Sequence, residues 1–558
     1  MSYLQLPRLY FFGTFRAAPS TINNIRANWN PNQPVPPNRE LWNPDGLHQF
    51  QLLSGTESWI PAGANVTPTT IQSLVLKDGK TVSSSSKDPL IGKFVISTNQ
   101  PTPGKLVDLD PDQQMVSQIW GMQVAIGDPN GEQVVGTYTA AYFSQLFGPR
   151  NIGANAPSGL SAAYQSQLTN LQWPSYPKST FLQQLQAASP DVLSIRFTVD
   201  LMDTSGTLDD GTPNPNFTLG RLTGAIGPSS ADEPAFFTPA RMLRVPPSSS
   251  TLQNEKANAS APPPAFNLAP AYVDPKRNVV VFDLANSLQF DDDNPVQGGT
   301  LQAAVSMPTG GVVLGTIDNS FQNYQQSAFV FEFPIEQSQV TDPLLIVFDD
   351  QTMLTENPSG AFIDADNHVF RMDANTSVEV TLTATTFGAT PSAGQTVTIG
   401  PAQVFSTGAT DGVITFNPST VTLVNGTATF TMSAGNPGTP RRFIDGQVYA
   451  VPFTWGADTI PDPNAFLSVH VYGVPASTAP TWANVGPILG QYAHLFPGMV
   501  GILDIGDQAT VNANAALLKS VLTLPPTSPN FMPVTRDMSG PRTAMVLAYL
   551  DSVIGGGS

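Results

Sequence analysis

Hydrophobic and polar residues alternate along most of this chain in short runs, which is the pattern of half-buried β-strands. The segment "SVEVTLTATTFG" is the clearest example, because Val378, Val380 and Leu382 share one face and polar residues take the other. The dipeptide Asn425-Gly426 separates two such runs, and it predicts a hairpin because both residues readily adopt positive φ. Other predicted strands lie at 93–98, 119–126 and 192–201, and in five runs between 266 and 360.

A helical period appears in only a few places. The segment 180–189 carries Phe181, Leu182 and Leu185 on one face, and Pro190 follows its end. Three further helices are predicted near the C-terminus, at 482–502, 507–524 and 539–554, with Asp507 and Ser539 as N-caps.

These patterns predict a mainly β, multi-domain fold: a β-barrel or β-sandwich body with an immunoglobulin-like sandwich and a small C-terminal helical subdomain. The expected division is a β-rich body at 1–250, a Pro/Ser-rich linker at 251–265, a β-sandwich unit at 266–360, an immunoglobulin-like sandwich at 361–474 and a helical subdomain at 475–558.

Composition narrows the choice of partners. The net charge is -18, and charged residues make up only 12% of the chain, so no basic surplus exists for nucleic acid or an anionic membrane surface. Cysteine is absent, which excludes disulfides, thiolate catalysis and cysteine metal sites. Pro7 and Arg8 interrupt the apolar segment 4–24, so we read it as a first strand and not as a secretory signal. These features favour a cytoplasmic protein.

Several segments together resemble one family. They are "LPRLYFFGTFRAAPSTINN" (6–24), "VDLDPDQQMVSQIWGMQV" (107–124), "GRLTGAIGPSSADEPAFFTPARML" (220–243), "QYAHLFPGMVGI" (491–502) and "NFMPVTRDMSGPRTAMVLAYLDSV" (530–553). In order and character they are similar to the N-terminal β-rich half of the imine-dimer synthases of violacein and chromopyrrolic acid biosynthesis. Those enzymes couple two oxidised tryptophan-derived units, and the family is linked with haem.

In that family a ferritin-like domain, rich in Glu and His, follows the β-rich half. Its helical metal motifs are absent here. The resemblance therefore implies a stand-alone relative of the β-rich half, and it does not carry over the coupling chemistry.

Arginines in these segments are the candidate ligand-binding residues: Arg8, Arg221, Arg241 and Arg536. Arginine is suited to capturing a carboxylate or phenolate ligand in a cleft. The alternative is structural, because a buried guanidinium must find acceptors for its five donors and can join strands by clasping Asp or backbone carbonyls.

Fewer sequence features point to metal and haem sites than to an arginine site. Asp108, Asp110 and Asp112 alternate in "VDLDPDQQ" and are candidate ligands for Ca²⁺, although Asp also suits a simple turn. The histidines, His48, His368, His470 and His494, lack metal-ligand spacing. His494 lies on a predicted helix and is the candidate for a single haem ligand. No nucleophile elbow, phosphate loop or dinucleotide fingerprint is found, so catalytic residues stay unassigned.

Two main hypotheses on function follow. The first is a non-catalytic scaffold or binding protein that takes a small aromatic or carboxylate ligand or a protein partner. The second is a cyclase, lyase or coupling enzyme of aromatic secondary metabolism. A third is carbohydrate binding, with Trp29, Trp42, Trp59 and Trp173 stacking on sugars.

Overall fold

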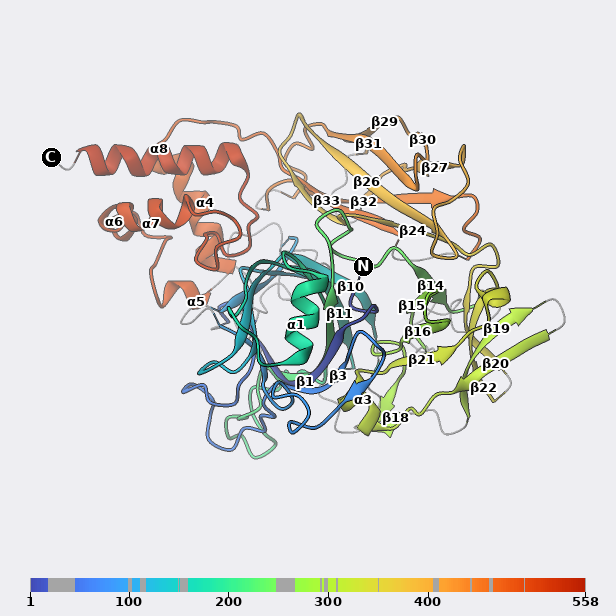
Figure 1. Ribbon diagram of the computed structural model, residues 1–558. Coiled ribbons are helices and arrows are strands. Elements are labelled where there is room, and N and C mark those ends of the chain that lie inside the picture. The colour runs from blue at the N-terminus through green and yellow to red at the C-terminus, as the bar shows by residue number, and fades with distance from the viewer. Residues whose placement is uncertain are drawn as a thin grey trace.

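A closed β-barrel lies at the centre of the molecule, and three other units surround it (Figure 1). A yellow-green sheet lies on one side of the barrel, the orange sandwich above it, and the red helices on the opposite side. The computed structural model describes residues 2–18, 46–98, 103–110, 117–148, 150, 159–246, 266–291, 294–295, 300–307, 310–349, 351–404, 411–441, 444–460, 465–495 and 497–556.

Four long antiparallel strands form one wall of the barrel: β1 (Arg8–Ala18), β13 (Leu219–Pro228), β12 (Leu193–Asp200) and β11 (Ser161–Gln172). At one end, the ring is closed by β3 (Thr70–Val75), β5 (Phe94–Ser97), β8 (Gln123–Gly127) and β9 (Gln133–Tyr138), and β4 (Thr81–Val82) flanks β3. At the other end, it is closed by β2 (Gln49–Leu52), β6 (Gly104–Asp108), β7 (Ser117–Trp120) and β10 (Ala141–Phe147). The same four long strands therefore belong to two closed rings.

Strand β1 shows how the sequence builds this arrangement. Leu9, Phe11 and Phe15 point into the barrel core, while Tyr10 and Phe12 pack in other apolar clusters, toward the second unit. The first half of the strand pairs with β3 and the last part with β2. Gly13 lies at the fork, where a Cβ atom would lie only 2.3 Å from the Cα of Thr69. The fork therefore needs a residue without a side chain.

Helix α1 (Thr180–Ala188) closes the β3–β9 end of the barrel. Its buried Phe181, Leu182 and Leu185 join the barrel core, as their spacing predicts. The Ser179 side chain caps the helix by accepting a hydrogen bond from the Leu182 N–H at 3.0 Å.

The second unit is one eight-stranded antiparallel sheet in the order β20-β19-β22-β23-β14-β15-β16-β21. Its strands are β14 (Arg241–Arg244), β15 (Ala269–Asp274), β16 (Val279–Asp283), β19 (Leu301–Met307), β20 (Gly310–Thr316), β21 (Val330–Pro334), β22 (Leu344–Phe348) and β23 (Gln351–Glu356). The unit also holds the hairpin β17 (Phe290–Asp291) and β18 (Asn294–Pro295), the helix α3 (Phe321–Ser327) and the short 3₁₀ helix Gln337–Gln339.

The second unit begins earlier in the chain than the sequence predicts, because β14 belongs to it. The sequence places residues up to 250 in the N-terminal body, but β14 pairs with β15 and β23. The unit therefore begins at Arg241, before the segment read as a linker, and that segment lies outside the described residues. Its strands form one hydrogen-bonded sheet, and the two edge strands of that sheet, β20 and β21, lie close to each other around a shared apolar core.

The third unit is the immunoglobulin-like sandwich. One sheet holds β24 (Ala361–Ala365), β26 (Thr376–Thr386), β31 (Thr427–Ala434) and β29 (Ile414–Asn417). The other holds β25 (Val369–Met372), β33 (Phe466–Val471), β32 (Gln447–Trp455), β27 (Thr396–Ile399), β30 (Thr420–Thr422) and β28 (Gln403–Val404). The predicted Asn425-Gly426 turn is present, with φ of 52° and 83°, but the strands on either side of it lie in different sheets and are joined by the bridge between Val424 and Thr427.

The C-terminal helices form their own apolar core. They are α4 (Trp482–Leu495), α5 (Pro497–Val500), α6 (Gln508–Ala513), α7 (Ala515–Leu522) and α8 (Gly540–Gly556). Asp507 caps α6, as predicted, by accepting from the Thr510 N–H at 2.8 Å. Among the described residues, no helix has the length and apolarity needed to cross a membrane.

Candidate functional site

The strongest candidate site is a cavity of about 290 Å³ where the barrel, the eight-stranded sheet and the sandwich meet. Strands β10, β11 and β12 of the barrel supply one wall. Met242 and Pro270 come from the second sheet, and β24 and β33 of the sandwich supply the opposite wall. We call it the junction cavity. Each unit brings residues from a different part of the chain, so the cavity exists only in the assembled fold.

Aromatic rings dominate its apolar lining. They are Tyr142, Phe143, Phe236, Phe237, Phe362 and Phe466. Phe237 and Phe362 meet edge to face, with ring centroids 6.0 Å apart, across the boundary between the first part of the chain and the sandwich. Such a lining is suited to a flat apolar or aromatic molecule.

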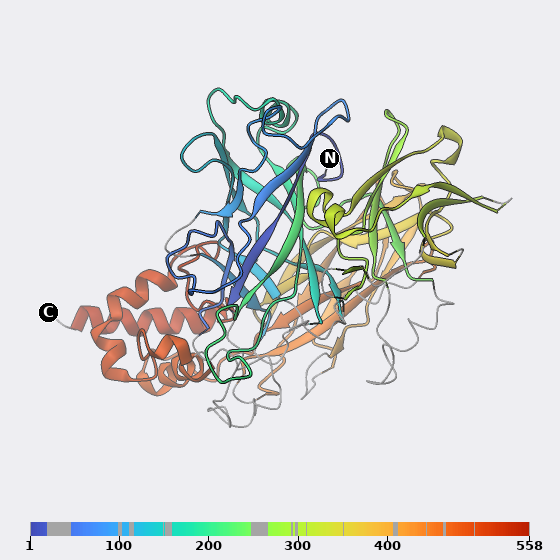
Figure 2. The same cartoon turned by 90° about the horizontal axis from the view of Figure 1, so that it is seen from below.

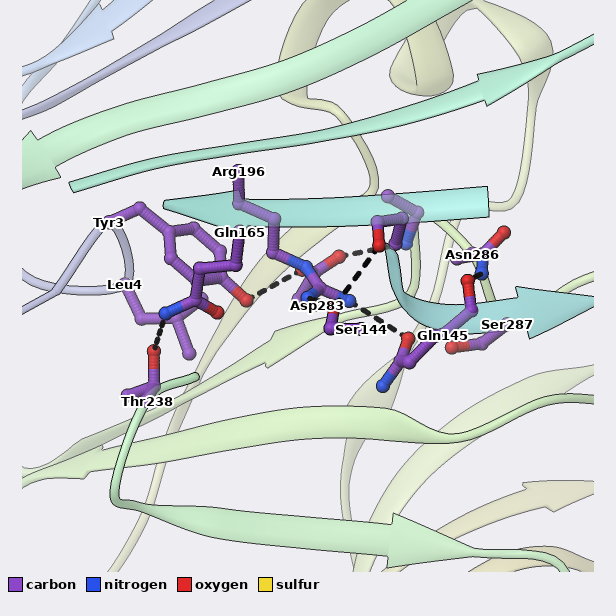
Figure 3. A network of polar contacts seen from close by, with 12 residues as sticks. Tyr3, Leu4, Ser144, Gln145, Gln165, Arg196, Thr238, Asp283, Asn286 and Ser287 are labelled. Carbon is purple, nitrogen blue, oxygen red and sulfur yellow. Dashed lines mark hydrogen bonds and ion pairs between the residues drawn. The ribbon is translucent and has the colours of Figure 1, made fainter. Parts of the chain in front are cut away.

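Arg196 is the central polar residue on the barrel wall (Figure 3). On β12 its neighbours Ile195 and Phe197 point into the barrel, so strand alternation turns Arg196 outward. Its Nε donates to Asp283 Oδ2 at 2.7 Å and its Nη2 donates to Gln145 Oε1 at 2.8 Å. Burial by itself lowers the pKa of Arg196, but Tyr3 and Asp283 outweigh it, and the pKa is raised. Arg196 is therefore a fixed cation.

A further set of polar groups supports that guanidinium. Tyr3 donates its hydroxyl hydrogen to Asp283 Oδ2 at 2.7 Å, and Ser144 Oγ accepts from Arg196 Nη1 at 3.2 Å. Gln165 lies next to Arg196 and donates to Thr238 Oγ1 at 3.1 Å. Asp283 belongs to the second sheet, so this network also joins that sheet to the barrel.

His368 and Asp364 form the polar wall on the sandwich side. The Nε2 atom of His368 contacts Asp364 Oδ1, and its Nδ1 lies 2.9 Å from the Phe466 carbonyl oxygen. The ring also packs on Tyr142, with centroids 5.0 Å apart. Both ring nitrogens therefore face oxygen atoms and already have partners.

Three of the four candidate arginines pair with carboxylates. Arg8 contacts Glu332 of β21, and its Nε donates to Tyr10 Oη at 2.6 Å. Arg221 forms two 2.8 Å hydrogen bonds with Asp200. Their geometry is that of the structural clasp.

Arg241 pairs in the same way, with Glu356. Its Nε lies 2.8 Å from Glu356 Oε1, and it also donates to the carbonyls of Val340 and Asp342 at 2.9 and 2.6 Å. Burial raises the pKa of Glu356, although Arg241 opposes this. Arg8, Arg221 and Arg241 thus lie in three separate places, and none of them lines the junction cavity.

Arg536 differs from these three, because its partners are the backbone carbonyls of Pro526, Ser528 and Val534. Asp537, the next residue in the chain, accepts from Thr535 Oγ1. Arg536 lines a second cavity, considered below.

The predicted calcium ligands have other partners. Asp110 is buried against Arg441, with Nη2 and Oδ2 2.6 Å apart, and Asp108 accepts from Ser117 Oγ at 2.5 Å. Asp112 lies outside the described residues. In the described part of the chain, no group of three or more His, Asp or Glu residues could hold a metal ion.

The other histidines are dispersed. His48 is buried, and burial lowers its pKa to about 4. His470 lies beside the Asp110–Arg441 pair, with its Nε2 2.8 Å from the Asp445 carbonyl oxygen. His494 falls within α4, but its side chain lies outside the described residues, so the haem prediction stays a prediction.

The tryptophans proposed as sugar platforms are placed only in part. Trp59 stacks on Arg16, whose Cζ lies 4.2 Å from the ring centroid, and Trp173 donates to the Pro190 carbonyl at 2.7 Å. Trp29 and Trp42 lie outside the described residues.

The sequence did not single out Arg196 as a site residue. The only signal was its position in "VLSIRFTVDL", where a charged residue interrupts an otherwise β-rich run. His368 and its partner Asp364 are four residues apart in "DADNH" (364–368), an acidic segment that raises the same question of Ca²⁺ binding as "VDLDPDQQ". This spacing is the one local clue to their pairing.

Comparisons with known proteins give little further guidance. No family model and no curated protein matches the chain. Among solved structures, domains 4 and 5 of the S-layer protein SbsC share 13% identity over 34% of this chain and 92% of that chain, with a TM-score of 0.14. Domains 1–6 of the same surface layer protein share 11% identity over 70% and 51% of the two chains, with a TM-score of 0.14.

A third similar structure is Salmonella alpha-2-macroglobulin reacted with methylamine. It shares 10% identity over 85% of this chain and 27% of that chain, with a TM-score of 0.13. Matches this distant carry no argument about function, which has to rest on the geometry of the cavities.

Proposed function

We propose that this protein is a small-molecule-binding protein whose ligand occupies the junction cavity and carries an aromatic ring and a carboxylate. The observation that supports this most is the combination of an aromatic lining with a buried, charged guanidinium in one cavity. Ligand sites in proteins usually combine a mainly apolar wall with a few fixed polar groups.

The volume of the cavity limits the size of the ligand. A volume of about 290 Å³ lies at the lower end of the usual range for small-molecule sites, which is roughly 300–1,000 Å³. A molecule with one or two rings and a short polar chain fits this volume. A polysaccharide or a large cofactor does not.

The polar end of the ligand is assigned to Arg196. A guanidinium has five N–H donors, and Arg196 uses its Nε, one bond from Nη1 and one from Nη2 for Asp283, Ser144 and Gln145. Each terminal nitrogen keeps a second N–H. A carboxylate oxygen is a suitable acceptor for either of these N–H groups.

The histidine on the opposite wall supports binding over acid–base catalysis. A general base needs a nitrogen that can take a proton from the substrate. In His368 one nitrogen faces Asp364 and the other faces the Phe466 carbonyl oxygen. The ring therefore joins β24 to β33 and presents a flat face beside Tyr142.

The test is direct binding to the full-length protein. Native mass spectrometry of the purified chain would show a retained ligand, and calorimetric titration with phenylpyruvate, benzoate and indole-3-acetate would measure affinity. We expect at least one probe to bind with a Kd below about 1 mM, which corresponds to roughly 4 kcal/mol.

Two variants fill the cavity from different walls: Ser468→Phe on β33 and Leu268→Phe from the second unit. Each is expected to weaken binding at least tenfold. Thr454→Phe, exposed on the neighbouring strand β32, is the matched control and should bind as the parent does. No retained molecule together with no binding of any probe would refute the proposal, as would unchanged binding in both filled variants.

A further inference from the structure

A second cavity, of about 490 Å³, lies where the barrel, the sandwich and the C-terminal helical unit meet. Figure 2 shows the red helices beside the barrel and the sandwich at this side of the molecule. Trp120 of β7, Arg371 of β25 and Arg536 before α8 line it, one from each of the three units. We call it the seam cavity.

Arg536, which is buried, and Arg371, which is half-buried, lack the carboxylate partner that other arginines of the fold have. Arg8, Arg196, Arg221, Arg241, Arg244 and Arg441 each form an ion pair with Asp or Glu. Arg371 donates to Gln118 Oε1 at 2.5 Å and to the Asp108 carbonyl at 3.1 Å, and Arg536 donates only to backbone carbonyls. Within the described residues, neither guanidinium has a carboxylate at ion-pair distance.

One donor beside the cavity lacks an acceptor within the part of the chain that the structure describes. The Nε atom of Arg371 is buried and has no hydrogen-bond partner among the described residues. A buried N–H without an acceptor is destabilising, and native proteins seldom leave one. This atom therefore points to a missing acceptor in or beside the cavity.

The two cations also repel each other. Burial lowers the pKa of Arg536, and Arg371 lowers it further, to about 9. Among the described residues, Asp373 is the one carboxylate that lines the cavity, and it accepts from the Gly540 N–H at 3.0 Å, at the start of α8. Its charge is thus held by the N-terminus of that helix.

Aromatic rings determine how a ligand reaches Arg536. The Cζ atom of Arg536 lies 5.5 Å from the centre of the Trp120 ring and 5.6 Å from that of Phe531. These rings pack against the guanidinium, so a ligand would use N–H groups that the carbonyls leave unoccupied. That approach suits an oxyanion better than a cation or a neutral apolar molecule.

We propose that the seam cavity is a second ligand site, which binds a small oxyanion, either a carboxylate or a phosphate, between Arg371 and Arg536. The bound anion supplies the missing acceptor and offsets the repulsion between the two cations. Because the two arginines come from different units, the anion also ties the helical unit to the sandwich and the barrel. This site does not depend on the function proposed for the junction cavity.

The test compares thermal unfolding of the full chain in inorganic phosphate, in benzoate and in chloride, all at the same ionic strength. Phosphate or benzoate should raise the Tm by roughly 2 °C or more over chloride, because a ligand that binds only the folded state stabilises it. A rise with phosphate alone identifies a phosphate site, and a rise with benzoate alone identifies a carboxylate site beside Trp120. A benzoate effect at the junction cavity is recognised by its loss in Ser468→Phe.

The decisive variant is Gln118→Glu, which places a carboxylate of nearly the same shape beside Arg371. It should raise the Tm in chloride and remove most of the response to phosphate or benzoate. Arg371→Gln should also remove the response, without raising the Tm. Gln172→Glu, exposed at the opposite end of the barrel, is the control and should respond as the parent does.

Two results would overturn the proposal. One is a parent protein whose Tm is the same in phosphate, benzoate and chloride. The other is an oxyanion response that Gln118→Glu and Arg371→Gln both keep in full.

Discussion

Removing Arg241 while leaving Glu356 in place should destabilise the protein strongly, and more at alkaline than at acid pH. Both side chains of the pair are almost fully buried, at 1% and 2% exposure. Arg241→Met leaves Glu356 with the Leu344 N–H, at 3.1 Å, as its remaining partner, and leaves the carbonyls of Val340 and Asp342 without this donor.

The magnitude follows from these contacts. Breaking one side of a buried ion pair usually destabilises by about 3–5 kcal/mol, because a charge is left without compensation. Each carbonyl that loses a donor adds roughly 1 kcal/mol when it stays dry. With both carbonyls counted, we therefore expect a loss of about 5–7 kcal/mol at pH 8.

The pH dependence has a definite sign. Burial already raises the pKa of Glu356, and Arg241 is the main influence that opposes the rise. In the variant the pKa rises further above the 4.5 of an ordinary Glu, so the folded state binds a proton more tightly than the unfolded chain does. Stability then increases as the pH falls through the folded pKa, by about 1.4 kcal/mol for each unit of the added shift.

Urea unfolding at pH 5.5 and pH 8 measures both effects, with parent and variant compared at each pH. The destabilisation should be smaller at pH 5.5 by about 1–2 kcal/mol. Adding Glu356→Gln to Arg241→Met should recover part of the loss at pH 8, since the amide carries no charge. Equal destabilisation at the two pH values, with no recovery in the double variant, would refute this account of the pair.

Three further changes test the fold. Arg8→Met should lower the free energy of unfolding by about 2 kcal/mol, less than Arg241→Met does, because Glu332 keeps Arg277 as a partner at 2.6 Å. Urea unfolding measures this, and a loss as large as that of Arg241→Met would contradict the reasoning. Ser179→Ala should lower stability by about 1–2 kcal/mol, since it removes the α1 cap; a variant as stable as the parent in the same assay would argue against the cap. Gly13→Ala should lower the free energy of unfolding by about 3 kcal/mol or prevent folding, because the added methyl group would clash with the backbone of Thr69. Circular dichroism and the yield of folded protein measure this. Normal folding with parental stability would show that the backbone at the fork can move to accept the methyl group.

Local structure was readable from the sequence wherever a period or a turn dipeptide specified it. The alternation in β26, the apolar face of α1 and the Asn425-Gly426 turn are all present. The sequence does not predict helix α3, because "FQNYQQS" is short and its only large apolar residues are Phe321 and Tyr324, too few to establish a helical period. Its one buried residue, Tyr324, packs between the barrel and the second sheet, so this helix depends on tertiary contacts that no local pattern reveals.

Closure of the barrel and formation of the cavities were beyond local reasoning. Leu9 pairs with Ile226 across more than two hundred residues, and no turn signal specifies that partner. For the candidate sites, the scarcity of basic residues drew attention to Arg536 but not to Arg371. An arginine forms a structural clasp when a carboxylate from a distant part of the chain lies beside it, and it keeps unpaired N–H groups when none does. Which of the two occurs depends on the assembled fold and not on the local sequence.

The two rings of the barrel have a consequence for how this fold can change over time. Each ring is closed by its own four short strands, while β1, β11, β12 and β13 serve both. Hairpins at one end can therefore be lengthened, replaced or recruited to a new surface while the ring at the other end stays closed. We expect descendants of this fold to keep the long strands almost unchanged and to diverge at one rim independently of the other.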